Sequence, residues 1–552
     1  MRYARPKPLK MTRREWPDRQ LEKNPIWCAV DLRDGNQALP DPLTPDQKKR
    51  YFQLLCELGF KEIEIGFPSA SADDFQFCRD LIEQNLIPAD VTISVLTQAR
   101  ESLIRRTLEA LKGCKRGVFH IYIATSDLHM RWVFGKTPEE TRKTILDAIK
   151  LARGIADQMS DEILLEFSPE EFTDSDLDFT VALCDEVVEA WQPKPGEKVI
   201  LNLPATVERR LPFEYADMIE EFCRRQKHRD QSIISLHSHN DMGGAVASTE
   251  MAVLAGADRI EGTLFGHGER SGNVDLVTLV LNFEYLGIDT GIKFRDIEKI
   301  RDEVAMLTSM PVNARHPYAG ELVFSAFSGS HQDAIHKGFN QKEKMAEFYH
   351  GWKIPYLHID PKDLGRSYEK FIRINSQSGK GGIAHVLASD QGVKLPRDFL
   401  IDFSKHVQAY ADKVQREVES AEIWTLFKRT YVEPAAPLRL VKYWPRPDAD
   451  DPGMINGEVH VEFQGQARVL NGTGQGPIAA FVHALKQLPL PEFTLADYQE
   501  DSLGKSADAE AIAMIRLVDA KNRSAFGAGL DSNINQAAVA AITTAINNLC
   551  KG

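Results

Sequence analysis

The feature that most constrains the fold is a series of short apolar runs, rich in β-branched residues, between residues 26 and 265. Runs of this length and composition are typical of buried β-strands. Longer stretches with helical periodicity separate them. The eight runs are IWCAVD (from Ile26), EIEIGF (Glu62), VTISVL (Val91), GVFHIYIA (Gly117), EILLEFS (Glu162), KVILNL (Lys198), SIISLHSH (Ser232) and DRIEGTLF (Asp258).

Two of the stretches between the runs begin like helices. Thr44 precedes Pro45 and Thr137 precedes Pro138, and these residue types are preferred at the N-cap and the first position of a helix. Eight strands that alternate with helices over about 250 residues are typical of a (β/α)8 barrel. A doubly wound open sheet is the alternative, but eight strands with no second repeat weigh against it. We therefore predict an α/β fold with a TIM barrel.

The pattern changes after the barrel, which divides the chain into four predicted parts. Residues 1–25 form a locally basic arm, expected to pack on a neighbouring subunit, and residues 26–315 form the barrel. Residues 316–430 combine helices with irregular segments in a mixed helical linker region. Residues 431–552 form the last part, and it begins with a proline- and charge-rich linker, residues 429–453. There EVHVEFQGQARVL alternates like an edge strand, and AIAMIRLVDA is a second strand run. GPIAAFVHALKQL and NINQAAVAAITTAINNL have helical periodicity, and together these segments predict a small α+β domain.

Composition excludes several classes of protein. A net charge of -13 argues against general nucleic-acid binding, because such surfaces are basic. No run reaches the roughly 18 apolar residues of a membrane-spanning helix, and the N-terminal arm lacks the apolar core of a secretory signal. The seven cysteines are odd in number and have no CxxC spacing, which favours reduced thiols. We expect a cytoplasmic protein without nucleic-acid or membrane partners.

Two histidines end the seventh run, in LHSHNDMGGAVA. Residues i and i+2 of a strand point to the same face, so His237 and His239 would direct their imidazoles to one place. Active sites of barrels lie at the carboxyl ends of the strands, where the first strand contributes Asp31 and Asp34. Imidazole nitrogens with carboxylate and amide or water oxygens favour Mg²⁺ or Mn²⁺, with Zn²⁺ as an alternative. Spacing does not choose between the aspartates, and a polar loop or a salt bridge to Arg33 is the competing interpretation.

A glycine-rich loop, GHGERSGN (266–273), follows the eighth run. It is a weak match to a nucleotide-binding fingerprint, because it lacks the Rossmann spacing and does not follow the first strand of a βαβ unit. Barrels often bind phosphate near the loops after strands seven and eight. A simple turn is the plainer interpretation, and Gly266 and Gly268 are candidates for contact with a phosphorylated cofactor.

Longer motifs, in this order along the chain, resemble 2-isopropylmalate synthases, above all their longer bacterial form. In the barrel they are DLRDGNQAL, EIEIGFPSAS, EFSPE, NLPATVE, LHSHNDMGGAVA and GADRIEGTLFGHGERSGNVDLVTL, and beyond it FSGSHQDAI, IPYLHIDP and NSQSGKGGIA. The resemblance covers nearly the whole chain. It implies an acyltransferase that condenses acetyl-CoA with 3-methyl-2-oxobutanoate and water, giving 2-isopropylmalate and CoA in the first committed step of leucine biosynthesis.

The resemblance also implies roles for single residues. A divalent metal, Mg²⁺ before Mn²⁺ or Zn²⁺, would be bound by Asp34, His237, His239 and Asn273, which leaves Asp31 without a ligand role. Arg33 matches the family's catalytic arginine. The groups implicated in proton transfer are Glu170, His331 and Tyr356, the last two expected from the partner subunit of a homodimer. Which of the three takes the proton stays open. Positions that hold the 2-oxo acid are Leu96, His120, Tyr122, Ser168 and Thr206.

The C-terminal segment NGTGQGPIAAFVHAL (471–485) resembles a regulatory domain that binds leucine at a dimer interface. The later glycine-rich segment, FGAGLDSNINQAAVAA, departs from the family's usual repeat, and Gly527 and Gly529 are candidates for cradling the effector. We expect leucine inhibition, with a dimerisation domain that binds no ligand as the alternative, and K⁺ is a candidate activator. The alternative activities are a homocitrate or citramalate synthase and a retro-Claisen acyl-CoA lyase. A metal-binding amino-acid sensor ranks last.

Overall fold

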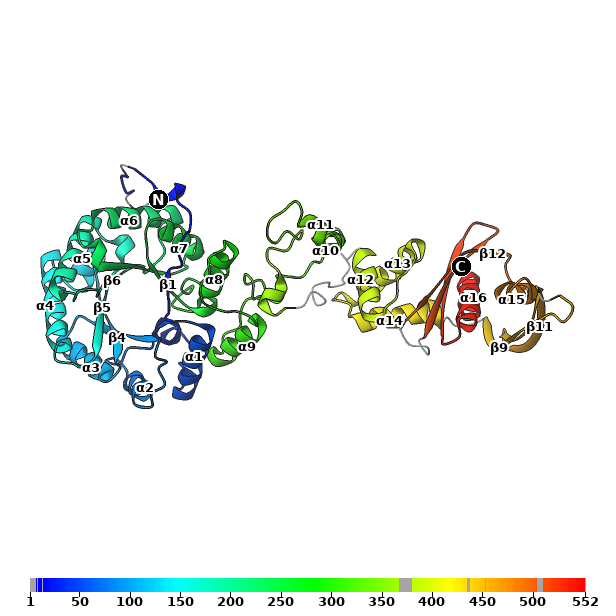
Figure 1. Cartoon of the computed structure of the whole chain (residues 1–552), viewed down its shortest axis with the longest axis horizontal. Helices are drawn as coiled ribbons and strands as arrows, with labels where there is room; N and C mark the ends of the chain where they lie inside the picture. The colour runs from blue at the N-terminus through cyan, green and yellow to red at the C-terminus, as the bar shows by residue number, and fades with distance from the viewer. Residues whose placement is uncertain are drawn as a thin grey trace. The chain divides into compact units, whose positions relative to one another are not determined.

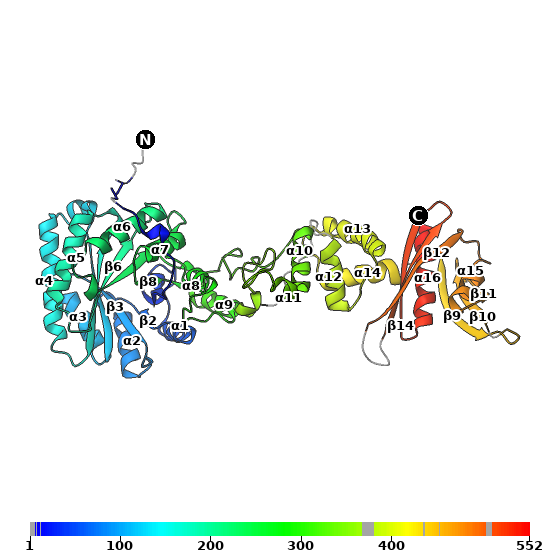
Figure 2. The ribbon, with the colours of Figure 1, turned by 45° about the horizontal axis from the view of Figure 1, so that its top comes forward.

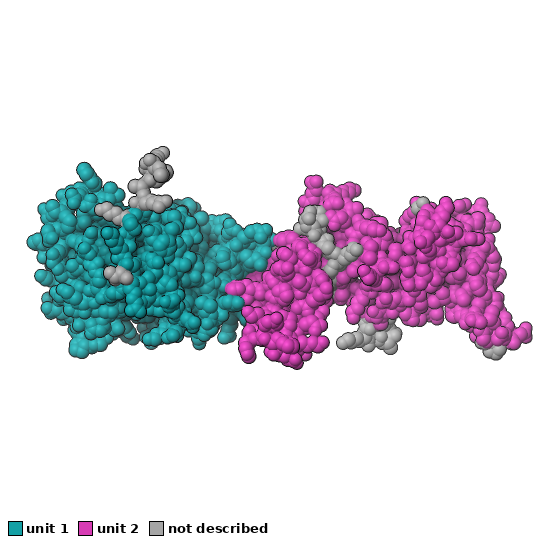
Figure 3. All heavy atoms as spheres, turned by 90° about the horizontal axis from the view of Figure 1, so that it is seen from above, with its two compact units in different colours: residues 1–323, 363–366 teal, residues 324–362, 367–552 magenta. Residues whose placement is uncertain are grey.

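The structure is a computed structural model that describes residues 6, 8–11, 13–366, 380–433, 437–451, 453–503 and 510–551. The chain forms two compact units, residues 1–323 with 363–366 and residues 324–362 with 367–552 (Figure 3). Residues 375–379 of the NSQSGKGGIA motif and the first five residues of the arm lie outside the described part. None of the helices within the described ranges is long and apolar enough to cross a membrane.

The first unit is a closed barrel of eight parallel strands with helices around it (Figure 1). The barrel closes where β8 pairs with β1. The strands are β1 Ile26–Ala29, β2 Glu62–Glu64, β3 Thr92–Gln98, β4 Arg116–Ala124, β5 Glu162–Glu170, β6 Val199–Ala205, β7 Ser232–Ser238 and β8 Arg259–Gly262. The helices are α1 Pro45–Leu58, α2 Ala72–Glu83, α3 Glu101–Leu111, α4 Pro138–Ala156, α5 Leu177–Trp191, α6 Pro212–Arg225, α7 Ala245–Leu254, α8 Leu276–Tyr285 and α9 Ile297–Thr308. The predicted TIM barrel is confirmed.

Local sequence explains where the barrel helices begin. Thr44 and Thr137 each form a capping box. The threonine side chain accepts the backbone N–H of the third helical residue, and the side chain of that residue accepts the backbone N–H of the threonine. The partners are Gln47 in α1 and Glu140 in α4. Pro at the first helical position loses nothing, because its missing N–H would have no partner there. Both predicted helix starts are confirmed.

The described end of the N-terminal arm packs on its own barrel. Trp16 is buried, and its indole N–H donates to Asp217 of α6 at 2.9 Å. Arg14 pairs with the same carboxylate, and the backbone N–H groups of Glu15 and Trp16 donate to Glu220. The arm was expected on a neighbouring subunit, but the buried carboxylates of α6 bind it within the chain.

The second unit begins with helices α10 Gly329–Asn340, α11 Lys342–Met345, α12 Lys380–Gln391, α13 Arg397–Val414 and α14 Ser420–Phe427. Two β-β-β-α repeats follow (Figure 2). The first consists of β9 Leu438–Pro447, β10 Ile455–Phe463, β11 Gln466–Gly474 and α15 Pro477–Leu485. The second consists of β12 Phe493–Ser502, β13 Ala511–Asp519, β14 Ser524–Asp531 and α16 Ile534–Lys551. Each repeat is a three-stranded antiparallel sheet followed by its helix.

Two sequence interpretations of this region were wrong. The single edge strand expected over 458–470 is a hairpin of β10 and β11, because Gln464 and Gly465 both have positive φ, as a tight hairpin turn requires. The expected linker 429–453 contains β9, whose prolines suggested a break. β9 is the edge strand of its sheet, where proline is tolerated because no further strand needs its N–H.

Glycines in the last strands allow close packing against the helices. A Cβ at Gly472 of β11 would lie 2.2 Å from the carbonyl oxygen of Ala480 in α15. A Cβ at Gly527 or Gly529 of β14 would lie 2.2 Å or 2.0 Å from a carbonyl oxygen of α16. Gly527 and Gly529 therefore lie in a strand packed on a helix and not in a loop.

Candidate active site and metal centre

A cavity of about 300 Å³ opens at the carboxyl ends of the barrel strands. Ten of the predicted substrate, catalytic and metal residues line it, namely Arg33, Asp34, Leu96, His120, Tyr122, Ser168, Glu170, Thr206, His237 and His239. Six further residues line it, namely Gln37, Phe67, Asn202, Pro204, Glu269 and Arg270. All of these residues belong to the first unit.

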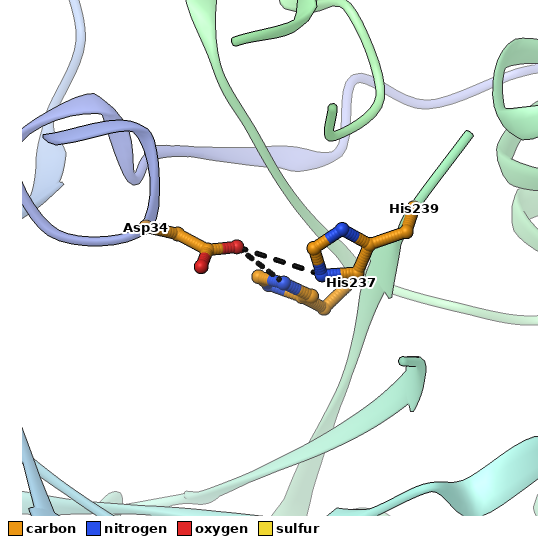
Figure 4. A group of neighbouring side chains, drawn as sticks. All are labelled: Asp34, His237 and His239. Carbon is orange, nitrogen blue, oxygen red and sulfur yellow. Dashed lines mark hydrogen bonds and ion pairs between the residues drawn. The ribbon is translucent and has the colours of Figure 1, made fainter. Parts of the chain in front are cut away.

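Three buried side chains converge in this cavity as a candidate metal centre (Figure 4). Asp34 follows β1, His237 lies in β7 and His239 follows β7. Asp34 Oδ2 lies 3.1 Å from His237 Nε2 and 3.6 Å from His239 Nε2. The two imidazoles reach one place because only Ser238 separates them in the extended chain. One carboxylate and two imidazoles within 4.8 Å of one another form a candidate site for a divalent cation.

The protonation of the two histidines follows from their neighbours. Burial opposes a charge on His237, but hydrogen bonds with Asp34 and Glu261 outweigh it and raise its pKa to about 9. Burial and the neighbouring His237 lower the pKa of His239 to about 4. His239 is therefore neutral, which is the form that binds a metal. His237 carries a proton in its contact with Asp34, and a divalent cation held by these two side chains would replace that proton.

Asn273 extends this group from the glycine-rich loop. Its Nδ2 donates to Asp34 Oδ2 at 2.7 Å, and its buried Oδ1 has no hydrogen-bond partner within the described ranges. A Cβ at Gly268, where φ is +152°, would lie 2.1 Å from that Oδ1. Glycine at 268 therefore makes room for the Asn273 amide. Gly266 and Gly268 are not among the cavity-lining residues, whereas Glu269 and Arg270 of the same loop are.

Arg33 is held beside Asp34 by two carboxylates. Its Nη1 lies 3.0 Å from Asp34 Oδ1, and its Nε donates to Glu64. Burial opposes its charge, but Glu64 and Asp34 raise the pKa of Arg33 above its ordinary value. The guanidinium thus keeps a fixed positive charge at the cavity wall.

Hydrogen bonds connect Arg33 to His237 through the interior of the barrel. Glu64 lies 2.5 Å from His120 Nδ1, and His120 Nε2 lies 2.7 Å from Ser168 Oγ. Asn202 donates to both Ser168 and Glu261 at 3.0 Å. Glu261 lies 2.8 Å from His237 Nδ1. The complete circuit is Arg33, Glu64, His120, Ser168, Asn202, Glu261, His237 and Asp34.

The other side of the cavity combines one carboxylate with apolar groups. Glu170 ends β5, and burial, the largest influence, raises its pKa above the ordinary value. The ring of Tyr122 packs edge-on against Phe67, with its hydroxyl bonded to Gln98. Leu96 is buried beside them.

His331 and Tyr356 belong to the second unit. Their rings stack with centroids 3.9 Å apart and planes inclined by 22°. Tyr356 is 64% exposed and has a positive φ of 62°. His331 and Tyr356 therefore contact each other in the second unit, while the other predicted site residues belong to the first unit.

Comparison with known proteins decides the family. Residues 24–304 match the family HMGL-like, residues 321–388 match "Alpha-isopropylmalate synthase, post-catalytic domain-like", and residues 417–550 match "LeuA allosteric (dimerisation) domain". The chain is 49% identical to 2-isopropylmalate synthase of Rhodospirillum rubrum, over 98% of this chain and 97% of that protein. It is 46% identical to the 2-isopropylmalate synthase of Ralstonia nicotianae, over 98% and 93%. The chain belongs to the 2-isopropylmalate synthase family.

Membership in the 2-isopropylmalate synthase family confirms the resemblance drawn from the motifs and the prediction of an acyltransferase. The predicted limits 26–315, 316–430 and 431–552 stay predictions. The dimerisation-domain match begins at residue 417, inside the predicted linker. Helices α13 and α14 also share a core with β13 and β14, which places these helices with the C-terminal sheets.

Sequence reasoning missed the buried charges that support the site. Arg259 of β8 is fully buried and contacts Glu62, Glu166 and Glu261. A sign of this network was present, because charged residues interrupt the apolar runs EIEIGF, EILLEFS and DRIEGTLF. A charge inside a buried strand requires a partner, and these runs supply opposite charges to one another.

Proposed function

We propose that this member of the 2-isopropylmalate synthase family condenses acetyl-CoA with 3-methyl-2-oxobutanoate. Water then hydrolyses the thioester, and 2-isopropylmalate and free CoA leave. Near full-length similarity to 2-isopropylmalate synthases carries the proposal, and the convergence of Asp34, His237 and His239 in the barrel cavity supports it. Leucine biosynthesis is the pathway that this product implies.

The proposed metal ligands are Asp34, His237, His239 and Asn273, and the donor set fits a divalent cation. His239 is neutral, and Asn273 has an unpartnered buried oxygen. Carboxylate, amide and imidazole donors favour Mg²⁺, then Mn²⁺ or Zn²⁺. When bound, the cation would act as a Lewis acid on the keto oxygen of the 2-oxo acid.

Arg33 would stabilise the negative charge that develops on the keto oxygen when the new carbon–carbon bond forms. Its guanidinium is fixed by Glu64 and Asp34 before substrate arrives, so little reorganisation is needed. Interactions of this kind lower a barrier by about 3–4 kcal/mol.

A base must remove a proton from the acetyl methyl group. Glu170 is the candidate within the barrel, since its raised pKa makes it a stronger base than an ordinary glutamate. His331 and Tyr356 are the other candidates, and we propose that they come from the partner subunit of a homodimer.

The isopropyl group of the 2-oxo acid would pack against Leu96 and Tyr122. Its polar end would lie near His120, Ser168 and Thr206. A pocket of this kind discriminates one methylene by about 1–3 kcal/mol. Pyruvate and 2-oxobutanoate are therefore expected to be poorer but detectable substrates. We propose that Gly266 and Gly268 contact the phosphorylated co-substrate, since Glu269 and Arg270 of the same loop line the cavity.

We further propose a cytoplasmic homodimer that leucine inhibits through its C-terminal domain, with K⁺ as a candidate activator. The match to a LeuA allosteric (dimerisation) domain supports the dimer and the regulatory role.

The test is a CoA-release assay by thiol titration with acetyl-CoA, Mg²⁺ and each of four acids, namely 3-methyl-2-oxobutanoate, 2-oxoglutarate, pyruvate and 2-oxobutanoate. Release fastest with 3-methyl-2-oxobutanoate, and slowed by leucine, would support the proposal. A preference for 2-oxoglutarate or pyruvate would favour a homocitrate or citramalate synthase instead. No release with any acid would favour the lyase or the sensor.

A further inference from the structure

The two histidines of the candidate metal centre differ in what holds their second nitrogen. His237 Nδ1 contacts the carboxylate of Glu261 at 2.8 Å. His239 Nδ1 is buried and has no hydrogen-bond partner among the described residues. A histidine that binds a metal through Nε2 carries its proton on Nδ1 and almost always donates it to a carboxylate, a carbonyl or a water. His239 therefore lacks one expected contact.

A second, much smaller cavity borders His239 within the barrel unit. Its volume is about 10 Å³, and the residues around it include Thr173, Glu208 and His239. Two further buried atoms without a described partner belong to these residues, Thr173 Oγ1 and Glu208 Oε1. One hydrogen-bond donor and two acceptors thus come from residues around one space. A water molecule needs about 10–15 Å³ of such volume and about three polar partners.

Glu208 is held so that one of its oxygens stays available. Its Oε2 accepts the backbone N–H groups of Met242 at 2.6 Å and Gly244 at 3.2 Å, where α7 begins. A Cβ at Gly244 would lie 2.5 Å from Glu208 Oε1, so the missing side chain leaves room for this carboxylate. Glu208 is 5% exposed and belongs to the interior.

We propose that one water molecule lies in this cavity, accepts the Nδ1–H of His239 and donates to Glu208 Oε1 and Thr173 Oγ1. Glu208 is then a positioning residue that fixes the tautomer and ring orientation of His239 through the water, as Glu261 does for His237 by direct contact. The inference rests on the proposed metal site. It assigns Glu208 and Thr173 to the support of that site.

The first test is Mn²⁺ binding to the chelator-treated full-length protein, measured by calorimetry. Glu208→Gln keeps an oxygen for the backbone N–H groups of Met242 and Gly244 but replaces the carboxylate that accepts from the water. We expect about 10-fold weaker Mn²⁺ binding, since the loss of such an outer carboxylate typically costs 10–100-fold. The matched control is Glu214→Gln, because Glu214 also accepts a backbone N–H at a helix start, that of Leu211 before α6, and does not line the small cavity.

A second variant covers the possibility that Glu208→Gln does not fold. Thr173→Val keeps the shape of the side chain and removes one partner of the water, so roughly threefold weaker Mn²⁺ binding is expected. The melting temperature of each metal-free variant reports folding. The absorption spectrum of the Co²⁺-loaded protein reports ligand geometry, which a purely structural role would leave unchanged.

The outcomes separate this inference from the proposed function. Weaker Mn²⁺ binding and an altered Co²⁺ spectrum in both variants, with the control like wild type, would support it. Binding and spectra like wild type in both variants would overturn it while CoA release continued. If wild type bound no divalent cation and released no CoA, the inference and the proposed function would both be wrong.

Discussion

At the scale of single residues, Arg33 offers a sharp test because its two carboxylate contacts need a guanidinium. Lysine in its place keeps the charge but offers one compact ammonium, which does not reproduce contacts to Asp34 and Glu64 at once. We expect Arg33→Lys to slow CoA release about 10²–10³-fold with a melting temperature close to wild type. Arg106→Lys, on the exposed surface of α3, is the control. A near-normal rate in Arg33→Lys would remove this residue from the mechanism.

The pH dependence of the rate tests Glu170 as the base. A base acts when deprotonated, so the rate should fall as the pH drops through the pKa of Glu170. Burial raises that pKa, so the acid limb of kcat/KM should lie above the value of about 4.3 for an ordinary glutamate. Glu170→Gln should abolish most turnover, whereas Glu139→Gln on the exposed face of α4 should not. Full turnover in Glu170→Gln would assign the proton to another group.

Some residues of the site could be predicted from the sequence, and others could not, for physical reasons. The spacing of His237 and His239 predicts convergence on any strand, but it does not separate Asp34 from Asp31. The structure separates them, since Asp31 Oδ1 accepts from the Tyr51 hydroxyl and the Leu264 N–H. Glu64 and Glu261 were not predicted because barrel strands are buried on both faces. Apolar and polar residues then do not alternate, so the sequence does not show which side chains point into the barrel.

At the scale of elements, close packing of a strand on a helix makes Gly529 intolerant of any side chain. A Cβ there would lie 2.0 Å from the carbonyl oxygen of Ala537 in α16. We expect Gly529→Ala to lower the free energy of unfolding by about 1–3 kcal/mol, measured by denaturant titration. Gly476→Ala is the control, because nothing lies within 4 Å of its Cβ position. Equal stability of the two variants would contradict this packing.

The packing of Gly527 and Gly529 on α16 limits what a substitution at either glycine can reveal about leucine binding. If Gly527 and Gly529 cradled the effector, an aspartate at either position would weaken leucine inhibition. Because both glycines face α16, such a change would disturb the fold first. A weakened leucine response in those variants would therefore not locate the effector.

Prediction of elements succeeded where burial on both faces gave nearly continuous apolar runs. All eight barrel strands were predicted for this reason. In the C-terminal sheets the buried strand β13 was predicted from its apolar run, but β9 and β12 were not, because β9 is rich in proline and β12 is exposed. β12 is exposed along nearly its whole length, and its sequence gives no apolar period.

At the scale of the whole molecule, the helical region and the C-terminal sheets are joined by shared cores. Alternate residues of β13 face opposite ways: Ile512 and Met514 pack with α13 and α14, while Ala513, Ile515 and Leu517 pack with α16. A boundary at residue 430 would separate Phe399 and Phe427 from the part of their core formed by Tyr431, Ile512, Met514, Phe526 and Ala528. The chain from α12 onward therefore behaves as one packed body.

The assembly of the active site can be tested by mixing two inactive variants. His331→Ala removes a residue of the second unit, and Glu170→Gln removes one of the first. If each barrel uses His331 and Tyr356 of its partner, a mixed dimer contains one site with both residues intact. Random exchange of subunits in equal amounts should then restore about a quarter of the wild-type rate of CoA release. As the control, His331→Ala mixed with Tyr356→Phe should restore nothing, because both changes lie in the same unit. No recovery in the first mixture, with exchange verified by mass spectrometry of tagged subunits, would place His331 and Glu170 of one site on the same chain.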